Sequence, residues 1–357
     1  MKTYVKFIIK VFLRSFLFTF LIMLGLVFVL NLLSELDFFK DINVNTLFPL
    51  YLTFLNSISI VFEMFPFIFL ISTQFFFIGF LKNNELDIFK YSGLKNDTII
   101  KVLGFLSFFM GVIIIVFFYN IVSNFKNFYL ELKSKYTSDD KYLAVITNNG
   151  LWIKDKLGKN TRFVNSKKIE AEFLIDNSIT EFDENFEIIR HIKSDKINIK
   201  NKEWIIENAQ IFIENNNILK NNLYIKSNFN YERIQSLFSN LSSLSIIELF
   251  ELKDNYQLLG YSTVEVNLQI HKLLSFPFYF LLMTILSSIL MLYFKELKSN
   301  GLRISIGLFL AVFIYYGNNF FYVLGNSEKI SLINSVWGPM IFLGLVNAIL
   351  LRRINEK

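Results

Sequence analysis

Apolar residues are gathered towards the two ends of this chain, and this arrangement constrains its fold more than any other feature. The chain is 53% hydrophobic, more apolar than a single soluble domain requires. A helix needs about 20 apolar residues to cross a bilayer. Runs of suitable length predict six membrane-spanning helices, at residues 16–33, 47–81, 102–122, 273–294, 304–324 and 332–351. Glu63 and Pro66 interrupt the run at 47–81, which is longer than one span needs, so a kink is expected there.

The middle of the chain, residues 124–261, has frequent charges and alternating apolar and polar residues, as half-buried strands do. Two such runs, 142–147 and 151–155, flank Asn148-Asn149-Gly150, a strong β-hairpin signal. Further strands are predicted at 186–199, 203–206, 210–213 and 222–226. Short strands at this spacing favour a β-sandwich or jelly roll, with Trp152 and Trp204 in its core. Ser245 and Glu248 form a capping box that begins a helix ending near Asp254.

The predicted fold is therefore a six-span α-helical membrane protein with an inserted all-β jelly-roll domain. We expect membrane helices in 1–123 and 262–357, and the β domain in 124–261.

A short polar segment between the second and third spans predicts a small helix at 84–92. Five residues carry this prediction: Glu85, Leu86, Asp87, Phe89 and Gly93. The two acids favour the first turn of a helix, and the glycine favours the position after its end. Leu86 and Phe89 share one face and form an apolar knob edged with carboxylates. These residues leave two interpretations of the helix: it closes the loop between two spans, or it docks a cytoplasmic partner.

Lysine and arginine are distributed unequally between the two sides of the predicted spans. If the N-terminus is cytoplasmic, fourteen basic residues lie on the inner side: Lys2, Lys6, Lys10, Arg14, Lys82, Lys90, Lys95, Lys101, Lys295, Lys298, Arg303, Arg352, Arg353 and Lys357. The short outer loops hold only Lys40 and Lys329. Basic residues concentrate on the cytoplasmic side. This bias predicts cytoplasmic termini, a cytoplasmic helix at 84–92 and a β domain outside the cytoplasm.

No catalytic or cofactor-binding motif is present in the sequence. Cysteine is absent, and His191 and His271 are far apart, so neither a thiolate nor a histidine metal site is expected. Gly158-Lys159 lacks the other residues of a phosphate-binding P-loop. We expect no enzyme, and any transport would draw energy from a partner or an ion gradient.

Polar residues in and beside the spans are candidate functional residues. Glu63 is an intramembrane acid, which either faces a polar cavity or serves an ion-coupled transporter. Tyr315, Asn319 and Tyr322 share one helical face, which makes either a polar helix contact or the lining of a path for an amphiphile. Lys40, at the outer end of the first span, could meet an anionic headgroup.

Several short segments, taken together and in order, resemble a known family. They are Glu85-Leu-Asp-Ile-Phe-Lys-Tyr-Ser-Gly93, Asn149-Gly-Leu-Trp-Ile-Lys-Asp155, Lys202-Glu-Trp204, Leu244-Ser-Ile-Ile-Glu-Leu249, His271-Lys272 before Pro277, and Trp337-Gly-Pro339. With three spans, a β domain and three more spans, they resemble the lipopolysaccharide export permeases LptF and LptG. Trp337-Gly-Pro339 is more similar to LptG.

The resemblance implies a permease subunit of an ABC transporter in the bacterial inner membrane, which extracts lipopolysaccharide or a similar glycolipid. Its implied partners are a cytoplasmic LptB-like ATPase dimer, a paralogous LptF-like permease and periplasmic LptC- and LptA-like jelly-roll proteins. It implies that the helix at 84–92 contacts the ATPase. Inward positions of the jelly roll, such as Ile153 and Ile211, would continue the lipid path. Two alternatives remain: a membrane-anchored partner-binding or signalling protein, and an ion-coupled transporter that uses Glu63.

Overall fold

The structure is a computed structural model that describes residues 2–42, 44–45, 47–136, 151–157, 160–170, 172–213, 216–231, 234, 240–259, 262–297 and 299–355. The chain divides into two compact units. Met1–Tyr129 and Val264–Lys357 form a helical unit, and Leu130–Thr263 form a second unit that contains the sheet. The predicted hairpin at 142–155 lies largely outside the described residues.

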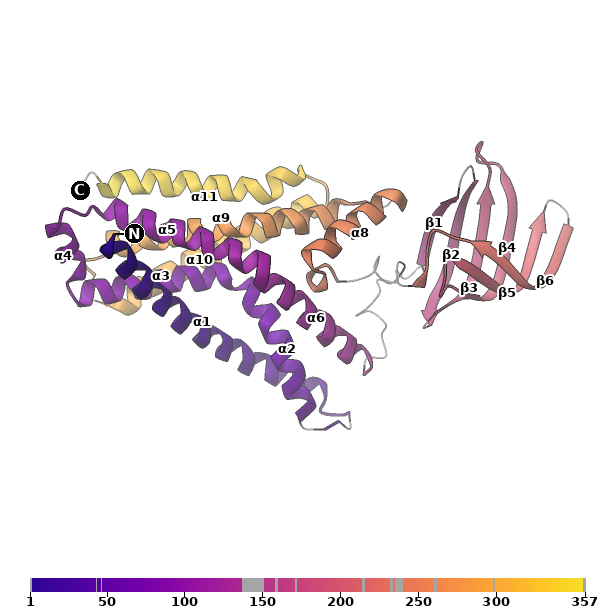
Figure 1. The fold of residues 1–357 in the computed structure, drawn as a ribbon, viewed down its shortest axis with the longest axis horizontal. Helices are drawn as coiled ribbons and strands as arrows, with labels where there is room; N and C mark the ends of the chain where they lie inside the picture. The colour runs from indigo at the N-terminus through magenta and orange to yellow at the C-terminus, as the bar shows by residue number, and fades with distance from the viewer. Residues whose placement is uncertain are drawn as a thin grey trace. The chain divides into compact units, whose positions relative to one another are not determined.

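Among its described residues, the helical unit contains six helices that are long and apolar enough to cross a membrane. Its elements are α1 (Thr3–Phe38), α2 (Leu47–Glu63), α3 (Phe65–Lys82), α4 (Glu85–Tyr91), α5 (Asn96–Ile113), the π-helical turn η1 (Ile114–Phe118), α6 (Tyr119–Ser134), α9 (Val264–Tyr293), α10 (Asn300–Asn326) and α11 (Leu332–Asn355) (Figure 1). The predicted fold class, membrane helices with an inserted all-β domain, is confirmed.

The long apolar run 47–81 is broken where the sequence predicts a kink. α2 ends at Glu63 and α3 begins at Phe65, with Pro66 in its first turn. Proline lacks an N–H group and fits the first turn of a helix, so it favours a new start there. The third span extends beyond its predicted end at residue 122, because α6 continues the helix to Ser134.

α9 is the central helix of this unit. In its most apolar window, 72% of the residues are buried, against 11% in α1 and in α10. α9 packs against α3, α5 and α11. α1 and α10 therefore present most of their apolar side chains outward, to lipid or to a partner.

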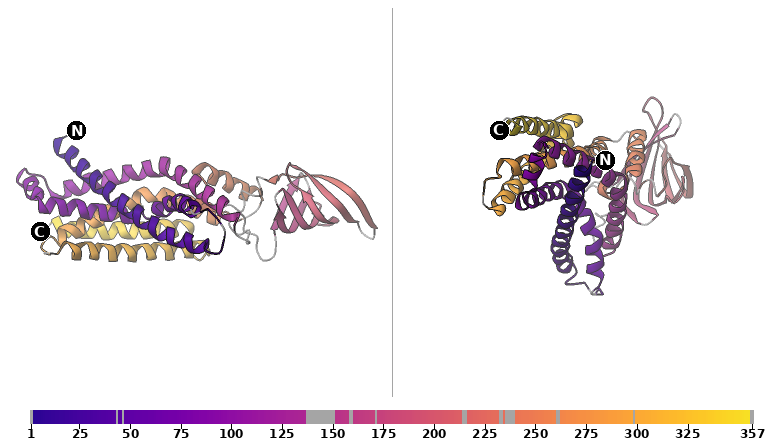
Figure 2. Two further views of the ribbon diagram at one scale, coloured as in Figure 1. Left: turned by 90° about the horizontal axis from the view of Figure 1, so that it is seen from below. Right: turned by 60° about the vertical axis from the view of Figure 1, so that its left-hand side comes forward.

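The C-terminal parts of α1 and α6 are joined to α2 by polar side chains. Asn56 donates to Asn31 Oδ1 at 3.0 Å, and Lys126 Nζ donates to Asn56 Oδ1 at 2.8 Å. Tyr129 Oη donates to Glu35 Oε1 at 2.8 Å. Figures 1 and 2 show these parts lying together and apart from α9, α10 and α11. Hydrogen bonds between helices fix this group as one body.

The second unit contains a six-stranded antiparallel sheet. Its strands are β1 (Leu151–Leu157), β2 (Asn160–Glu170), β3 (Phe173–Phe182), β4 (Ile188–Asn198), β5 (Glu203–Ile213) and β6 (Asn216–Lys226). They pair in chain order, so the sheet is a meander. One row of aligned residues crosses all six strands: Ile153, Val164, Ile179, Ile192, Ile211 and Ile218. The first five are buried, because alternate residues of a strand share one face.

The predicted sheet differs from the structure at several points, and the first is that β2 and β3 lie in segments where no strand was predicted. The runs at 203–206 and 210–213 belong to one strand, β5, and β6 begins at Asn216 rather than near 222. Trp204 lies in the core as predicted, but Trp152 is 54% exposed because it alternates with the inward-facing Ile153.

A capped helix, α8 (Ile246–Leu259), follows the short 3₁₀ turn η3 (Leu241–Ser243). The backbone N–H of Ser245 donates to Glu248 Oε2 at 2.7 Å, and the N–H of Glu248 donates to Ser245 Oγ at 3.3 Å. These reciprocal bonds confirm the predicted capping box.

Candidate functional site

A pocket of about 130 Å³ lies among α2, α3, α9, α10 and α11 of the helical unit. α2 contributes Glu63, its last residue, and α9 contributes Lys272. The α10 side is polar and consists of Tyr315, Asn318, Asn319 and Tyr322. The structure thus brings Glu63 together with the three polar residues that the sequence places on one face of α10.

The break between α2 and α3 positions the acidic side of the pocket. Glu63 is exposed on the surface of the helical unit, and Pro66, in the first turn of α3, lines the same pocket. The opposite charge comes from Lys272, whose Nζ lies 5.6 Å from the centre of the Tyr322 ring. This distance is suitable for a cation–π contact, which holds the ammonium group over α10.

Two hydrogen-bonding groups at the pocket lack a partner of acceptable geometry among the described residues. They are the Tyr279 hydroxyl and the Asn318 side-chain nitrogen, and both are buried. A buried donor without a partner costs about 1–3 kcal/mol. The pocket therefore contains donors that a polar ligand or water could satisfy.

The charged residues of the pocket lie at a similar height in the helices. With a rise of 1.5 Å per residue, Glu63 is about 28 Å from the end of α3 at Lys82, and Lys272 is about 32 Å from the end of α9 at Tyr293. Tyr322 is about 33 Å from the start of α10 at Asn300. The hydrocarbon core of a bilayer is about 30 Å thick. The pocket therefore lies about one hydrocarbon thickness away from these helix ends.

α10 approaches its neighbours closely on either side of the pocket. Near its start, Gln74 Nε2 of α3 donates to the Arg303 carbonyl at 3.2 Å, and a Cβ on Gly307 would lie only 2.0 Å from that nitrogen. Near its end, a Cβ on Gly325 would lie 2.4 Å from Ser335 Oγ of α11. Glycine permits both approaches, so α10 is held at two points with the pocket between them.

α4, the helix predicted to contact an ATPase, has its apolar face turned inward. Leu86 is 3% exposed, and the Phe89 ring is stacked on Phe80 of α3 with centroids 5.6 Å apart. The prediction that Leu86 and Phe89 form an exposed knob is therefore wrong. Leu86 is buried and Phe89 half-buried because α4 is too short to be stable without packing.

The outer face of α4 carries Ile88, 60% exposed, and Tyr91, 91% exposed. The acids lie in the first turn as predicted, and Asn83 Nδ2 donates to Glu85 Oε1 at 3.3 Å. Asn84 precedes the helix with a positive φ of 55° and makes no side-chain cap. Gly93 follows it with φ 79°, which glycine adopts without strain.

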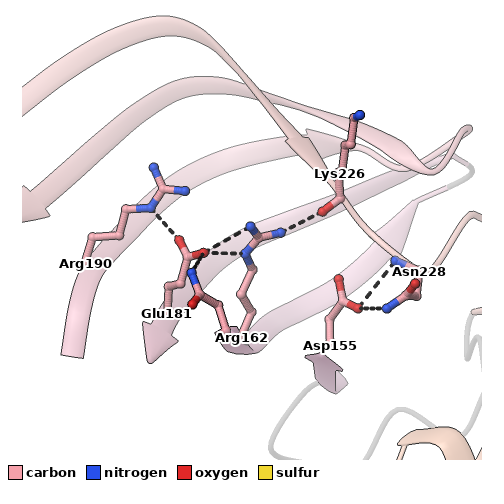
Figure 3. A network of polar contacts seen from close by, with 7 residues as sticks. Asp155, Arg162, Glu181, Arg190, Lys226 and Asn228 are labelled. Atoms are coloured by element: carbon pink, nitrogen blue, oxygen red, sulfur yellow. Dashed lines mark hydrogen bonds and ion pairs between the residues drawn. The ribbon is translucent and has the colours of Figure 1, made fainter. Parts of the chain in front are cut away.

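One end of the curled sheet is fastened by polar contacts (Figure 3). Arg162 of β2 donates to the Lys226 carbonyl of β6 at 2.6 Å, although four positions in strand order separate these strands. Asp155 of β1 accepts from the Asn228 side chain at 2.9 Å. These contacts join the two edges of the sheet, so its apolar face encloses a core that includes Ile153 and Ile211.

Glu181 anchors the same network. Its carboxylate accepts from Arg162 Nη2 at 3.0 Å and from Arg190 Nε at 2.5 Å, and its side chain is 4% exposed. Burial raises the pKa of Glu181, but the hydrogen bond from Arg190 and the charges of Arg162 and Arg190 outweigh this effect and lower it. The carboxylate is therefore kept ionised.

The family model described as lipopolysaccharide export system permease LptF/LptG matches residues 6–353. The chain belongs to the LptF/LptG family. No curated protein matches the chain. The family match includes both units, so the helices and the inserted sheet form one LptF/LptG permease fold.

Lys40, Ile153 and Ile211, the other predicted lipid-path residues of this LptF/LptG permease, do not line the pocket. Lys40, beyond the end of α1, forms an exposed ion pair with Asp37 at 3.2 Å and does not line the pocket. Ile153 and Ile211 are inside the sheet, as expected for inward positions. Their contact with lipid remains a prediction.

Sequence reasoning did not identify Lys272 or Tyr279 as pocket residues. Lys272 had no distinctive signal, because a lysine next to the end of a span commonly extends its ammonium group to the interface. Tyr279 had none either, since an aromatic residue in a span is common. In the described part of the chain, no cluster of His, Asp and Glu is arranged to hold a metal ion.

Proposed function

We propose that this chain is a transmembrane permease subunit of an ABC transporter that extracts lipopolysaccharide, or a similar glycolipid, from the inner membrane. A separate cytoplasmic ATPase dimer hydrolyses ATP, and a paralogous permease forms the other half of the pathway. The lipid then passes to a bridge of periplasmic jelly-roll proteins. The observation that carries this proposal is the family match from residue 6 to residue 353, across both units.

The charge distribution supports cytoplasmic termini and a periplasmic sheet, with fourteen basic residues against two. α4 then lies on the cytoplasmic side, where Ile88 and Tyr91 offer an apolar contact to the ATPase. Glu85 and Asp87 would meet basic groups at its edge. We expect movement of the ATPase to reach the spans through the stack of Phe89 on Phe80.

The exposed apolar surfaces of α1 and α10 support a lateral lipid pathway shared with a second permease. The apolar interior of the sheet supports its continuation. A long acyl chain that leaves the bilayer needs continuous apolar cover, because each CH₂ group exposed to water costs about 0.8 kcal/mol.

Purification of the chain with its native partners would test the proposal. We expect an ATPase and a second permease to co-purify, and the reconstituted complex to release glycolipid to a soluble jelly-roll acceptor only with hydrolysable ATP. Dissipating the proton gradient should leave this release unchanged. Release that follows the proton gradient without ATP would favour the ion-coupled alternative, and a bound partner without lipid release would favour a signalling protein.

A further inference from the structure

The pocket holds one acid and one base that do not neutralise each other. Among the described residues, Glu63 and Lys272 line the same pocket but form no ion pair with each other or with a third residue. Opposite charges that share one small pocket attract each other, so an arrangement that leaves them apart keeps both available to a ligand. A pair that is held near, but not in contact, fits a ligand that carries both charges.

The other polar groups favour an anion beside Lys272. The Tyr279 hydroxyl and the Asn318 side-chain nitrogen are buried and lie near each other, and in the described part of the chain neither makes a hydrogen bond of acceptable geometry. Ser275 also lines the pocket, but its hydroxyl already donates to the Lys272 carbonyl at 2.8 Å, so these two donors are the ones available to a ligand. Charge-assisted hydrogen bonds from such donors to a phosphate oxygen are stronger than bonds between neutral groups.

The depth of the pocket restricts the ligand further. Glu63, Lys272 and Tyr322 lie about 28–33 Å from the basic helix ends, where the polar groups of the opposite leaflet begin. A headgroup whose acyl chains remain in that leaflet could reach the pocket from the side without crossing the hydrocarbon core.

We propose that this pocket binds a zwitterionic lipid headgroup that contains a primary ammonium and a phosphate diester. Glu63 accepts from the ammonium, and Lys272 pairs with the phosphate, assisted by the Tyr279 and Asn318 donors. The proposal rests on the proposed membrane function, and it specifies what the helical unit recognises. The headgroup can come from a phosphatidylethanolamine of the bilayer or from a phosphoethanolamine substituent on the exported glycolipid.

Native mass spectrometry of the delipidated full complex tests this recognition. An equal mixture of phosphatidylethanolamine and phosphatidylglycerol with identical acyl chains is offered. The two headgroups share the phosphate, but only the first has an ammonium. We expect the wild-type complex to retain phosphatidylethanolamine about tenfold better, as expected for one additional charge-assisted interaction.

Two substitutions test the roles of the acidic and the basic side chain one at a time. Glu63→Gln should abolish the preference and leave phosphatidylglycerol binding unchanged, while Lys272→Met should weaken binding of both lipids. Glu328→Gln and Lys329→Met are matched controls, because this adjacent Glu–Lys pair is exposed in the α10–α11 turn. The exchange Glu63→Lys with Lys272→Glu should restore part of the preference. An unchanged preference in both single variants would overturn the proposal, and so would equal loss in the controls.

Further binding comparisons identify whether the headgroup comes from a bilayer phospholipid or from the exported glycolipid. Glycolipid that carries phosphoethanolamine is compared with glycolipid that lacks it, and soluble O-phosphoethanolamine is added as a competitor. Glu63-dependent binding of the decorated glycolipid, of phosphatidylethanolamine or of both supports the proposed chemistry and names its source. Glu63-independent binding of all three contradicts it. None of these measurements requires transport, so loss of ATP-dependent release would count against the proposed function alone.

Discussion

At the residue scale, Glu181 is one of two deeply buried carboxylates in the described part of the sheet, with Asp155, and it lies between Arg162 and Arg190. Arg162 also bonds the Lys226 carbonyl, so the carboxylate orients the side chain that joins β2 to β6. Removing one member of a buried charge group leaves the others without compensation, which is costly.

Glu181→Gln should therefore destabilise the sheet by about 2–4 kcal/mol. The measurement is hydrogen–deuterium exchange of β2, β3 and β6 in the purified complex. Asp176→Asn is a matched control on β3, because Asp176 pairs with Lys167 on the surface, and asparagine tolerates its positive φ. We expect less than about 0.5 kcal/mol from the control. Equal protection in both variants would show that the network contributes nothing.

The sheet should also become less stable on acidification. Burial lowers the pKa of His191 below its ordinary 6.5, and the neighbouring charge of Lys193 lowers it further. Its ring also contacts Thr180 Oγ1 at 3.0 Å and the Phe212 ring. A lowered histidine pKa gives stability that is complete above 6.5 and is lost as the pH falls through the folded value. The lowered pKa of Glu181 acts in the same direction below its ordinary 4.5.

Exchange of β3 and β4 should accordingly be faster at pH 5.5 than at pH 7.5, after correction for intrinsic rates. His191→Gln removes the titrating group and should remove most of this difference. An identical pH dependence in the variant would assign the effect to other groups.

At the element scale, α5 packs on α9 through small residues one and two turns apart: Gly104, Ser107 and Gly111. Thr284 Oγ1 of α9 donates to Ser107 Oγ at 2.8 Å. A Cβ on Gly111 would lie 2.7 Å from Pro277 Cα, whereas a Cβ on Gly104 would meet side-chain atoms at 3.5 Å or more. Close helix approach in membranes depends on such small residues.

Gly111→Ala should therefore force α5 and α9 apart and cost about 1–3 kcal/mol, whereas Gly104→Ala should be neutral. The measurement is the midpoint temperature of thermal unfolding in detergent for the two variants. Both substitutions lie in the same contact, between α5 and α9. Similar midpoints for the two variants would contradict the close approach of Gly111 to Pro277.

α4 gives a second prediction at this scale. Tyr91→Ser should weaken ATPase binding at least tenfold, because a large exposed aromatic side chain at an interface commonly contributes 2 kcal/mol or more. Leu302→Ser is the matched control, since Leu302 is a 58% exposed apolar residue on the same side of the membrane but outside α4. Co-purification of the ATPase measures the effect. Full retention of the ATPase by the Tyr91 variant would exclude this face as its contact.

The sequence was sufficient to predict which segments are helices but not which way α4 faces. Charge at its first turn and glycine after its end are local signals, and the helix forms where they predict it. The orientation depends on Phe80 and Phe7, which come from other helices and meet Phe89 only in the folded chain. Likewise, alternation predicted strands within β1, β4, β5 and β6 but not β2 or β3, and the short interruption inside β5 resembled a turn because Glu207 and Asn208 are polar.

At the whole-molecule scale, the absence of cysteine allows topology to be tested directly. A single cysteine in place of the exposed Tyr91 should react with a membrane-impermeant maleimide only after the inner membrane is opened. A cysteine in place of Leu219, 72% exposed on β6, should react once the outer membrane alone is permeable. The reverse pattern would overturn the proposed orientation.

The pocket depends on this larger scale as well. Its charged residues are about two hundred positions apart in the sequence, and only the packing of α9 against α3 and α10 brings them together. Periodicity predicted the face of α10 that carries Tyr315, Asn319 and Tyr322, because it repeats within one helix. It could not predict which helix that face meets, since contacts between helices have no local signal.

The two close approaches of α10, at Gly307 and at Gly325, make it resemble a beam clamped at both ends. The space beside a helix held in this way widens when the middle of the helix bends, and not when the whole helix rotates. Gly317 lies between the clamps with no atom within 4 Å of its Cβ position, and glycine is the weakest helix former after proline. We expect the curvature to concentrate there, beside Tyr315 and Asn318. Headgroup exchange would then need an elastic deformation of one helix, while the rest of the bundle stays in register.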